Sequence, residues 1–276
     1  VSASLIALRT AAGAPIAHLL SNGGYAVMMT ASGGGYSRWR DIAVTRWRED
    51  ATRDDWGSFV FLRDMRSGNV WSATTQPMAG GASESDVVFG EDHAEFIRHD
   101  VGLTTTMDVI VSGEHNGEVR RVSLTNSGRL TRKIELTSYA ELVLTTPATD
   151  EAHPAFAKMF VETEHLPEFG ALLATRRLRT PGEPQIWAAH FAVVEGEVAA
   201  APQYETDRAR FIGRGRDVGT AAAMSGGLSL SNTVGTVLDP VFSLRQSVRI
   251  APGKVARGAF WTLVASARAE PPDPHQ

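Results

Sequence analysis

The residues best suited to chemistry lie between Asn22 and Gln76, in a segment unlike the rest of the sequence. Four of the six tryptophans occur there, at positions 39, 47, 56 and 71, interleaved with arginines and carboxylates. Indole rings pack against the apolar faces of sugar rings. Charged side chains form directional hydrogen bonds to the hydroxyls, which are costly to leave unpaired. The segment therefore favours a surface that binds carbohydrate.

The same residues also fit a purely structural role. Tryptophan and arginine can close the ends of a β-sandwich, and the neighbours Arg40/Asp41 and Arg63/Asp64 could form structural ion pairs. The triplet at residues 33–35, Gly-Gly-Gly, permits a sharp turn or a close approach of a ligand to the backbone. It lacks the Lys-Ser/Thr pair of a phosphate-binding P-loop, so we expect no nucleotide site.

A second candidate is the loop 152–158, which follows a predicted strand and carries His153, Phe156 and Lys158. Binding residues concentrate in loops at strand ends. The alternative is a crossover loop that Phe156 packs in place.

Groups for covalent catalysis are poorly arranged in the sequence. The carboxylate neighbours Glu49/Asp50 and Asp54/Asp55 do not make a glycosidase pair, because adjacent residues on a strand point to opposite faces and a glycosidase needs two across a cleft. The eight histidines are scattered without the spacing of a metal site, and cysteine is absent. We therefore expect no metal, no cofactor and no catalytic residue in this chain.

The elements that must position these residues show a period of two. Apolar and polar residues alternate over 103–111, 134–141, 242–250 and 256–264, with turn signals at 126–128 and 252–253. This pattern predicts long antiparallel hairpins. Only 4–12 and 154–160 could form short helices. The predicted fold class is all-β, a large antiparallel sandwich with few short helices.

Composition bounds the remaining classes. The 276 residues are 43% hydrophobic and 21% charged, which is typical of a globular protein. A net charge of −4 makes nucleic acid a poor partner. No apolar run reaches the roughly 20 residues of a membrane span, and the N-terminus lacks the features of a signal peptide. We predict one domain over 19–268, with a lead-in at 1–18 and a proline-rich linker or tail at 269–276.

Several runs together resemble glycoside hydrolase family 94, which includes the cellobiose and chitobiose phosphorylases. The resemblance extends over essentially 19–268, and within the family it favours the branch found in bacterial enzymes that make cyclic β-glucans. The runs that carry it are residues 18–25, 35–41, 46–50, 56–57, 62–64, 71–77, 125–128, 135–141, 153–156 and 239–241.

The resemblance implies a galactose mutarotase-like β-supersandwich, followed in the family by a linker and an (α/α)6 barrel that carries the catalytic acid. It implies a non-catalytic domain whose partners are a β-glucan or oligosaccharide, that barrel, and a second copy in a homodimer. It also places the domain on the cytoplasmic side of the bacterial inner membrane, within a membrane-anchored enzyme. The positions carried over as carbohydrate contacts are Tyr36, Arg38, Trp39, Arg40, Asp41, Arg48, Glu49, Asp50, Trp56, His153, Phe156 and Lys158. Two alternatives stay open: a self-sufficient mutarotase-like epimerase, which needs a His acid and a Glu base across a cleft, and a purely structural sandwich.

Overall fold

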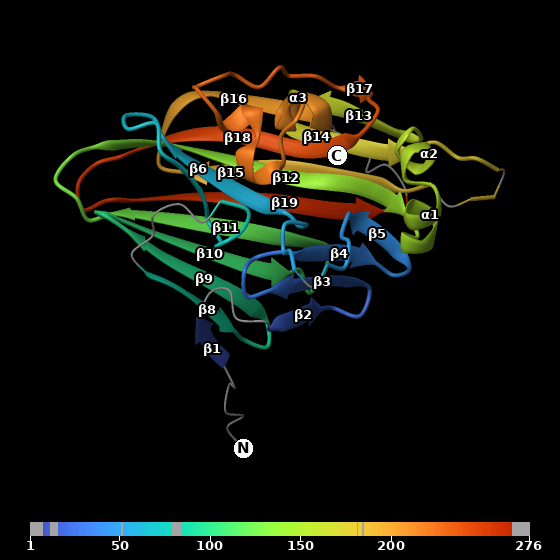
Figure 1. Ribbon diagram of the computed structural model, residues 1–276, viewed down its shortest axis with the longest axis horizontal. Coiled ribbons are helices and arrows are strands. Elements are labelled where there is room, and N and C mark those ends of the chain that lie inside the picture. The colour runs from blue at the N-terminus through green and yellow to red at the C-terminus, as the bar shows by residue number, and fades with distance from the viewer. Residues whose placement is uncertain are drawn as a thin grey trace, which may run out of the picture.

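Two large antiparallel sheets form the body of the molecule (Figure 1). The computed structural model describes residues 8–11, 16–50, 52–78, 84–180, 182–183 and 185–266. The first sheet has ten strands in the order β1-β8-β9-β10-β11-β19-β15-β14-β13-β17. The second sheet has nine, in the order β16-β18-β12-β5-β4-β3-β2, with β6 on β12 and β7 on β6. Every strand pairing in the described part of the chain is antiparallel.

The strands of the first sheet are β1 (Leu8–Ala11), β8 (Glu84–Phe89), β9 (His93–Asp100), β10 (Leu103–Val111), β11 (Gly117–Asn126), β13 (Val161–Leu166), β14 (Ala171–Arg176), β15 (Trp187–Glu195), β17 (Gly235–Thr236) and β19 (Val255–Ala265). Those of the second sheet are β2 (Ala17–Ser21), β3 (Tyr25–Thr30), β4 (Gly35–Trp39), β5 (Ile42–Thr45), β6 (Phe59–Asp64), β7 (Val70–Ser72), β12 (Arg132–Thr145), β16 (Glu197–Asp207) and β18 (Pro240–Ile250).

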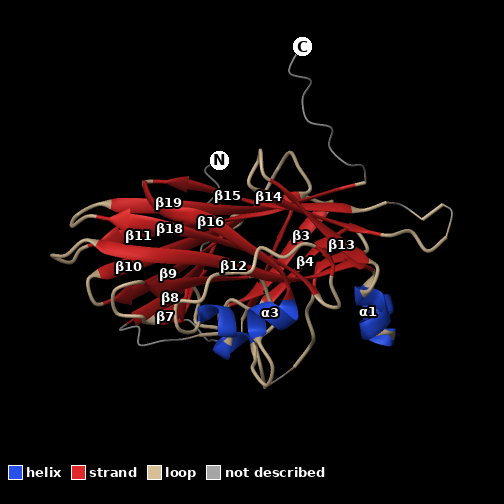
Figure 2. Cartoon of the chain, turned by 90° about the horizontal axis from the view of Figure 1, so that it is seen from above, coloured by secondary structure: helices blue, strands red, loops and turns tan. Residues whose placement is uncertain are grey.

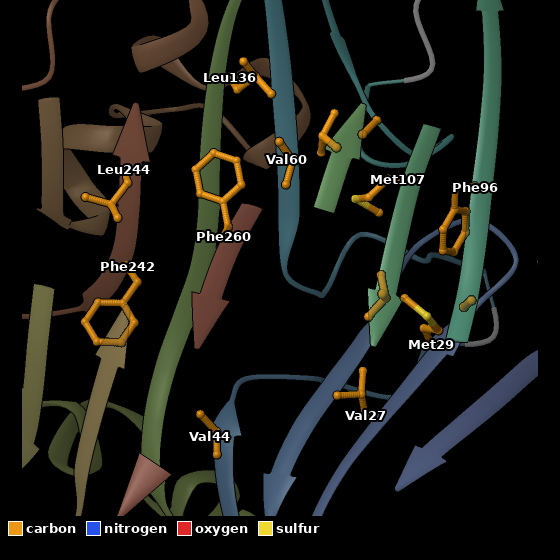
Figure 3. Packing of buried hydrophobic residues seen from close by; sticks show 14 of the residues in the cluster. Val27, Met29, Val44, Val60, Phe96, Met107, Leu136, Phe242, Leu244 and Phe260 are labelled. Carbon is orange, nitrogen blue, oxygen red and sulfur yellow. The ribbon is translucent and has the colours of Figure 1, made fainter. Parts of the chain in front are cut away.

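The period-two pattern places one face of each sheet in the core. On β10, Leu103, Thr105, Met107 and Val109 are buried while Thr104, Thr106 and Asp108 are partly exposed, as the alternation predicts. Met107 and Phe96 of the first sheet lie near Met29 and Val27 of the second (Figure 3). The main core thus fills the space between the sheets.

The predicted strands are confirmed, but two of the predicted hairpins are wrong. The turn at 126–128 joins β11 in the first sheet to β12 in the second, and the turn at 251–254 joins β18 to β19 in the same manner. Alternation gives the faces of a strand but not its partner. The turns therefore cross the sandwich instead of closing hairpins.

Strand β12 is buried on both faces over most of its length, which the alternation did not predict. A second core covers its outer face, where Tyr139 packs with Phe59, Phe61 and Phe211. Phe211 belongs to α3 (Arg208–Ile212), which is followed by the 3-10 turns η1 (Val218–Thr220) and η2 (Ala222–Met224). The segment 208–230 thus acts as a lid over the middle of the second sheet.

Helices are few and short, and they lie along one side of the strands (Figure 2). Helix α2 (Pro154–Lys158) confirms the helix predicted near 154–160, and α1 (Pro147–Ala152) precedes it. The helix predicted at 4–12 is wrong where it can be compared, because Leu8–Ala11 form β1 against β8. The rest of that stretch and the predicted tail at 269–276 lie outside the described residues. No helix among the described residues is long and apolar enough to cross a membrane.

Candidate functional site

An open hollow lies where the tryptophan-rich segment meets the lid. It encloses about 850 Å³, and we call it the acidic hollow. Its main lining residues are Trp47, Glu49, Asp50, Asp54, Asp55, Gln76 and Asp217. Two of the carbohydrate contacts expected from sequence, Glu49 and Asp50, line it directly. Trp47, from the same tryptophan-rich segment, supplies its aromatic wall.

The glycine triplet shapes this region by approaching other parts of the chain. A side chain at Gly34 would collide with the carboxylate of Asp54, and one at Gly33 with Thr74. Gly35 has φ 144°, and a Cβ there would lie 2.0 Å from the carbonyl oxygen of Met28. Its N–H donates to the carbonyl of Trp56 at 2.8 Å. The triplet therefore lets the segment carrying Asp54 and Trp56 lie flat against β3 and β4.

Negative charge dominates the hollow. Among the described residues, five carboxylates line it, at Glu49, Asp50, Asp54, Asp55 and Asp217, against one cation, Arg53. Hydrogen bonds from the Thr52 hydroxyl and N–H lower the pKa of Asp50, and Asp54 accepts from the Thr30 hydroxyl. The hollow therefore presents mainly carboxylate acceptors. No group of three acidic or histidine side chains in the described ranges is placed to hold a metal ion.

An aromatic contact links the hollow to the outer face of β4. The Trp47 and Tyr36 rings meet edge to face with centroids 5.8 Å apart, and the Arg38 guanidinium lies 5.1 Å from the Tyr36 ring centroid. Both strand residues are half-buried and point away from the core. The structure thus brings Tyr36 and Arg38 to the border of the hollow.

The remaining candidates of the first segment are scattered. Trp39 is a core residue, 6% exposed, and Arg40 covers its ring from the turn where Arg40 adopts φ 56°. Asp41 is exposed beside it. Trp56 is half-buried and does not line the hollow. Arg40 and Asp41 form no ion pair with each other, and Arg63 and Asp64 pair with Glu135 and Arg132 instead of with each other.

A buried ionic cluster lies beyond the hollow, where β5, β12, β18 and α1 meet. Arg46 is at its centre. Its Nη1 is 2.9 Å from Glu141 and 3.3 Å from Asp239, and its Nε and Nη2 contact both oxygens of Asp150. Glu141 also accepts from the Tyr139 hydroxyl and from Arg208. Burial alone would raise the pKa of Glu141 and of Asp150, but the surrounding arginines outweigh burial and lower both. Glu141 and Asp150 are therefore ionised at neutral pH.

Two predicted contact residues belong to this cluster. Arg48 pairs with Asp150, and the Lys158 ammonium lies 2.7 Å from Asp239. The structure thus unites side chains from the two separate candidate segments, and each is held by a carboxylate. His153 and Phe156 flank them and are exposed on the α1–α2 surface, where Arg179 lies over the Phe156 ring.

Sequence reasoning missed the centre of this cluster. Arg46, Glu141 and Asp239 all occur in the runs that carry the family resemblance, so a signal was present. Nothing in their sequence separation indicated that they meet.

Two characterised proteins are similar to this chain in sequence. The chain is 45% identical over 250 residues to the cyclic beta-(1,2)-glucan synthase NdvB of Rhizobium meliloti (strain 1021), an alignment that spans 91% of this chain and 9% of that protein. It is 24% identical over 251 residues to the N,N'-diacetylchitobiose phosphorylase of Vibrio furnissii, across 89% of this chain and 30% of the relative. The chain therefore spans less than a third of either relative.

The fold also aligns with a solved structure. A bacterial glucoamylase complexed with acarbose superimposes with a TM-score of 0.51 at 8% identity, over 96% of this chain and 36% of the glucoamylase. The two sheets and this likeness define a β-supersandwich, which confirms the predicted fold class. The model of the glycosyl hydrolase 94 supersandwich domain matches residues 5–273, so the chain belongs to that family.

Proposed function

We propose that this domain is a non-catalytic, carbohydrate-binding part of an enzyme of cyclic β-(1,2)-glucan metabolism, and that the acidic hollow holds the glucan. The observation that carries the proposal is the juxtaposition of the half-buried Trp47 ring with Glu49, Asp50, Asp54 and Asp55 around one opening.

The chemistry of the hollow suits a neutral polyol. Sugar hydroxyls donate to ionised carboxylates in charge-assisted hydrogen bonds, while an indole packs on the apolar ring face. Gln76 and Arg53 supply donors at the same opening. An anionic glycan would be repelled by the five carboxylates, so we assign an uncharged glucan.

The relatives supply the context of the proposal. This chain aligns with 9% of the Rhizobium synthase. We therefore propose that it acts beside a phosphorylase-like catalytic barrel in a longer, membrane-anchored parent. The domain would lie on the cytoplasmic side of the inner membrane. The α1–α2 surface, where Phe156 and Met159 are 49% and 48% exposed, is our candidate for the contact with that barrel or with a second copy.

A second candidate function is purely structural support of the barrel. It is favoured by the ion pairs that hold Arg48 and Lys158 and by the burial of Trp39 and Trp71 in the core. The mutarotase-like alternative gains no support, because the lining of the acidic hollow includes no histidine among the described residues.

Calorimetric titration with β-1,2-glucooligosaccharides tests the proposal. We expect saturable heat with the wild-type domain and at least about a tenfold weaker affinity for Trp47→Ala, since tenfold corresponds to about 1.4 kcal/mol. Trp261→Ala is the matched control, because that half-buried indole lies on β19 and does not line the hollow. Absence of heat from the domain, with heat restored when the catalytic barrel is present, would favour the structural role.

A further inference from the structure

A second hollow of about 850 Å³ lies at the end of the sandwich farthest from α1 and α2. The β6–β7 turn, the β9–β10 turn and the β11–β12 turn form its walls, and the last of these is the green loop at the left of Figure 1. It shares no lining residue with the acidic hollow. We call it the arginine hollow.

The charges of this hollow are unbalanced toward positive. Four arginines line it, at 66, 98, 129 and 132, against Asp64 and Asp100. Asp100 accepts from Arg98 at 2.9 and 3.1 Å, and Arg98 is 2% exposed. Asp64 accepts from Arg132 at 3.1 Å. Each carboxylate is therefore neutralised by one arginine.

Arg66 and Arg129 remain as surplus cations. Both are exposed, and neither forms an ion pair with any residue in the described ranges. They come from two different turns, and both line the hollow. The hollow thus carries two positive charges that have no counter-ion among the described residues.

Two of the strongest acceptors in the same space are already occupied. Asp64 is further occupied by the N–H groups of Arg66 and Ser67, at 2.8 and 3.2 Å. The carbonyl of Val101 already accepts from Arg132. The charged groups that remain available are donors, so a ligand that carries negatively charged acceptor oxygens is favoured over a neutral one.

The hollow also has an apolar component. Trp71 lines it at 6% exposure, and its indole Nε1 has no hydrogen-bond partner among the described residues. Val101 and Leu130, 89% and 58% exposed, stand at the rim. A bound group can therefore bury carbon on one side while the arginines hold oxyanion oxygens on the other.

We propose that the arginine hollow is a binding site for a sugar-sized ligand that carries an oxyanion, of the phosphate-ester class. The phosphoryl oxygens lie between Arg66 and Arg129, and the ring of the ligand lies toward Trp71 and the apolar rim. The domain thus has two sites of opposite preference. The proposal for this site does not depend on whether the acidic hollow binds glucan.

Titration with three probes tests the site in the intact chain: glucose 6-phosphate, inorganic phosphate and glucose, followed by calorimetry and by tryptophan fluorescence. We expect glucose 6-phosphate to bind in the millimolar range, more weakly as salt rises, and glucose not to bind here. If inorganic phosphate binds as tightly as glucose 6-phosphate, the binding free energy comes from the oxyanion alone. A weaker affinity for it would show that the sugar ring contributes.

The variant Arg66→Ala/Arg129→Ala should lower the affinity for glucose 6-phosphate at least tenfold, or about 1.4 kcal/mol. Arg214→Ala/Arg216→Ala removes the same charge from exposed positions outside this hollow and should leave the affinity unchanged. Trp71→Phe should remove the fluorescence response. Glucose binding as tightly as its phosphate, no saturation by either phosphate probe up to about 20 mM, or equal loss in both double variants overturns the proposal.

Discussion

Arg46 and Asp150 face each other in the interior, with the guanidinium Nε and Nη2 3.2 and 3.1 Å from the two carboxylate oxygens. Both side chains are 2% exposed, although 104 residues separate them in the sequence. This bidentate pair joins the end of β5 to α1. It therefore fixes the loop that carries Trp47 and Glu49 relative to the α1–α2 surface.

Removal of Arg46 should destabilise the domain strongly. Arg46→Met leaves Glu141 and Asp150 buried with fewer counter-charges, which typically costs about 3–5 kcal/mol. Arg53→Ala is the control, since Arg53 is exposed and its pair with Asp55 at 3.6 Å should contribute about 0–1 kcal/mol. Urea unfolding at pH 7 measures both. Equal effects of the two substitutions would contradict a structural role for the cluster.

Acid should weaken the same cluster. The pKa values of Glu141 and Asp150 are lowered in the folded protein, from unfolded values of about 4.3 and 3.9. Their contribution is therefore present above about pH 5 and is lost as pH falls through the lowered pKa values, below about pH 4. The difference in unfolding free energy between wild type and Arg46→Met should shrink between pH 6 and pH 3. A constant difference would argue against ionised partners.

His190 should make the free energy of unfolding fall at a milder pH than the carboxylates do. Burial, reinforced by Arg120, lowers its pKa to about 4, while its ring nitrogens lie 2.8 Å from the Ser138 hydroxyl and 3.1 Å from that of Thr262. The unfolded imidazole titrates near 6.5, so only the unfolded state binds a proton between those values. The free energy of unfolding should fall by about 3 kcal/mol from pH 7 to 4. His190→Gln, which keeps polar atoms beside both hydroxyls, should lack that portion of the loss.

Gly35 should tolerate no side chain. Gly35→Ala combines the positive φ with a collision against the Met28 carbonyl and should cost more than about 2 kcal/mol. Gly68 has φ 75° but nothing within 4 Å of a Cβ, so Gly68→Ala should cost only about 1 kcal/mol. Thermal unfolding of both variants separates conformational strain from steric collision. Similar melting temperatures would show that β3 and β4 can move apart.

Substitution of Trp39 and of Trp47 should affect different properties, stability in the first case and glucan affinity in the second. Trp39→Ala creates a cavity in the core and should cost about 3–5 kcal/mol of stability while leaving the affinity of the folded domain for glucan intact. Trp47→Ala should cost less stability and weaken glucan binding. Urea unfolding and calorimetry on the same two samples check the contrast. A drop in affinity for Trp39→Ala at a temperature where it is folded would place the binding surface elsewhere.

The fold was largely predictable, because alternation is a local property. The faces of β10 and the existence of β12, β18 and β19 follow from side chains two residues apart. The pairing partner of each strand was not predictable. β11 pairs with β19 and β12 with β18, at separations that no local pattern encodes. The burial of Glu135 and Glu141 also escaped prediction, because their arginine partners come from other strands.

The sequence predicted which residue types form the candidate site, but not which individual residues meet there. The tryptophan-rich segment does contribute Trp47, Glu49 and Asp50 to one opening, but it sends Trp39 to the core and Arg48 to an ion pair. On β4, residues one position apart face opposite ways, so Trp39 enters the core while Arg38 stays on the outer face. Arg48 lies in the loop after β5, where strand alternation gives no guide to its direction. Asp217 joins the hollow from the lid, far along the chain.

The last two strands, β18 and β19, occupy interior positions in the two sheets, between β16 and β12 and between β11 and β15. During synthesis neither sheet can close until residues 240–265 have left the ribosome. Until then β11 and β12 present unpaired edges, and pairings of such long range form slowly. The edges of β11 and β12 therefore stay open to misassociation until residues 240–265 are available, and we expect the yield of the folded domain to depend on chaperones.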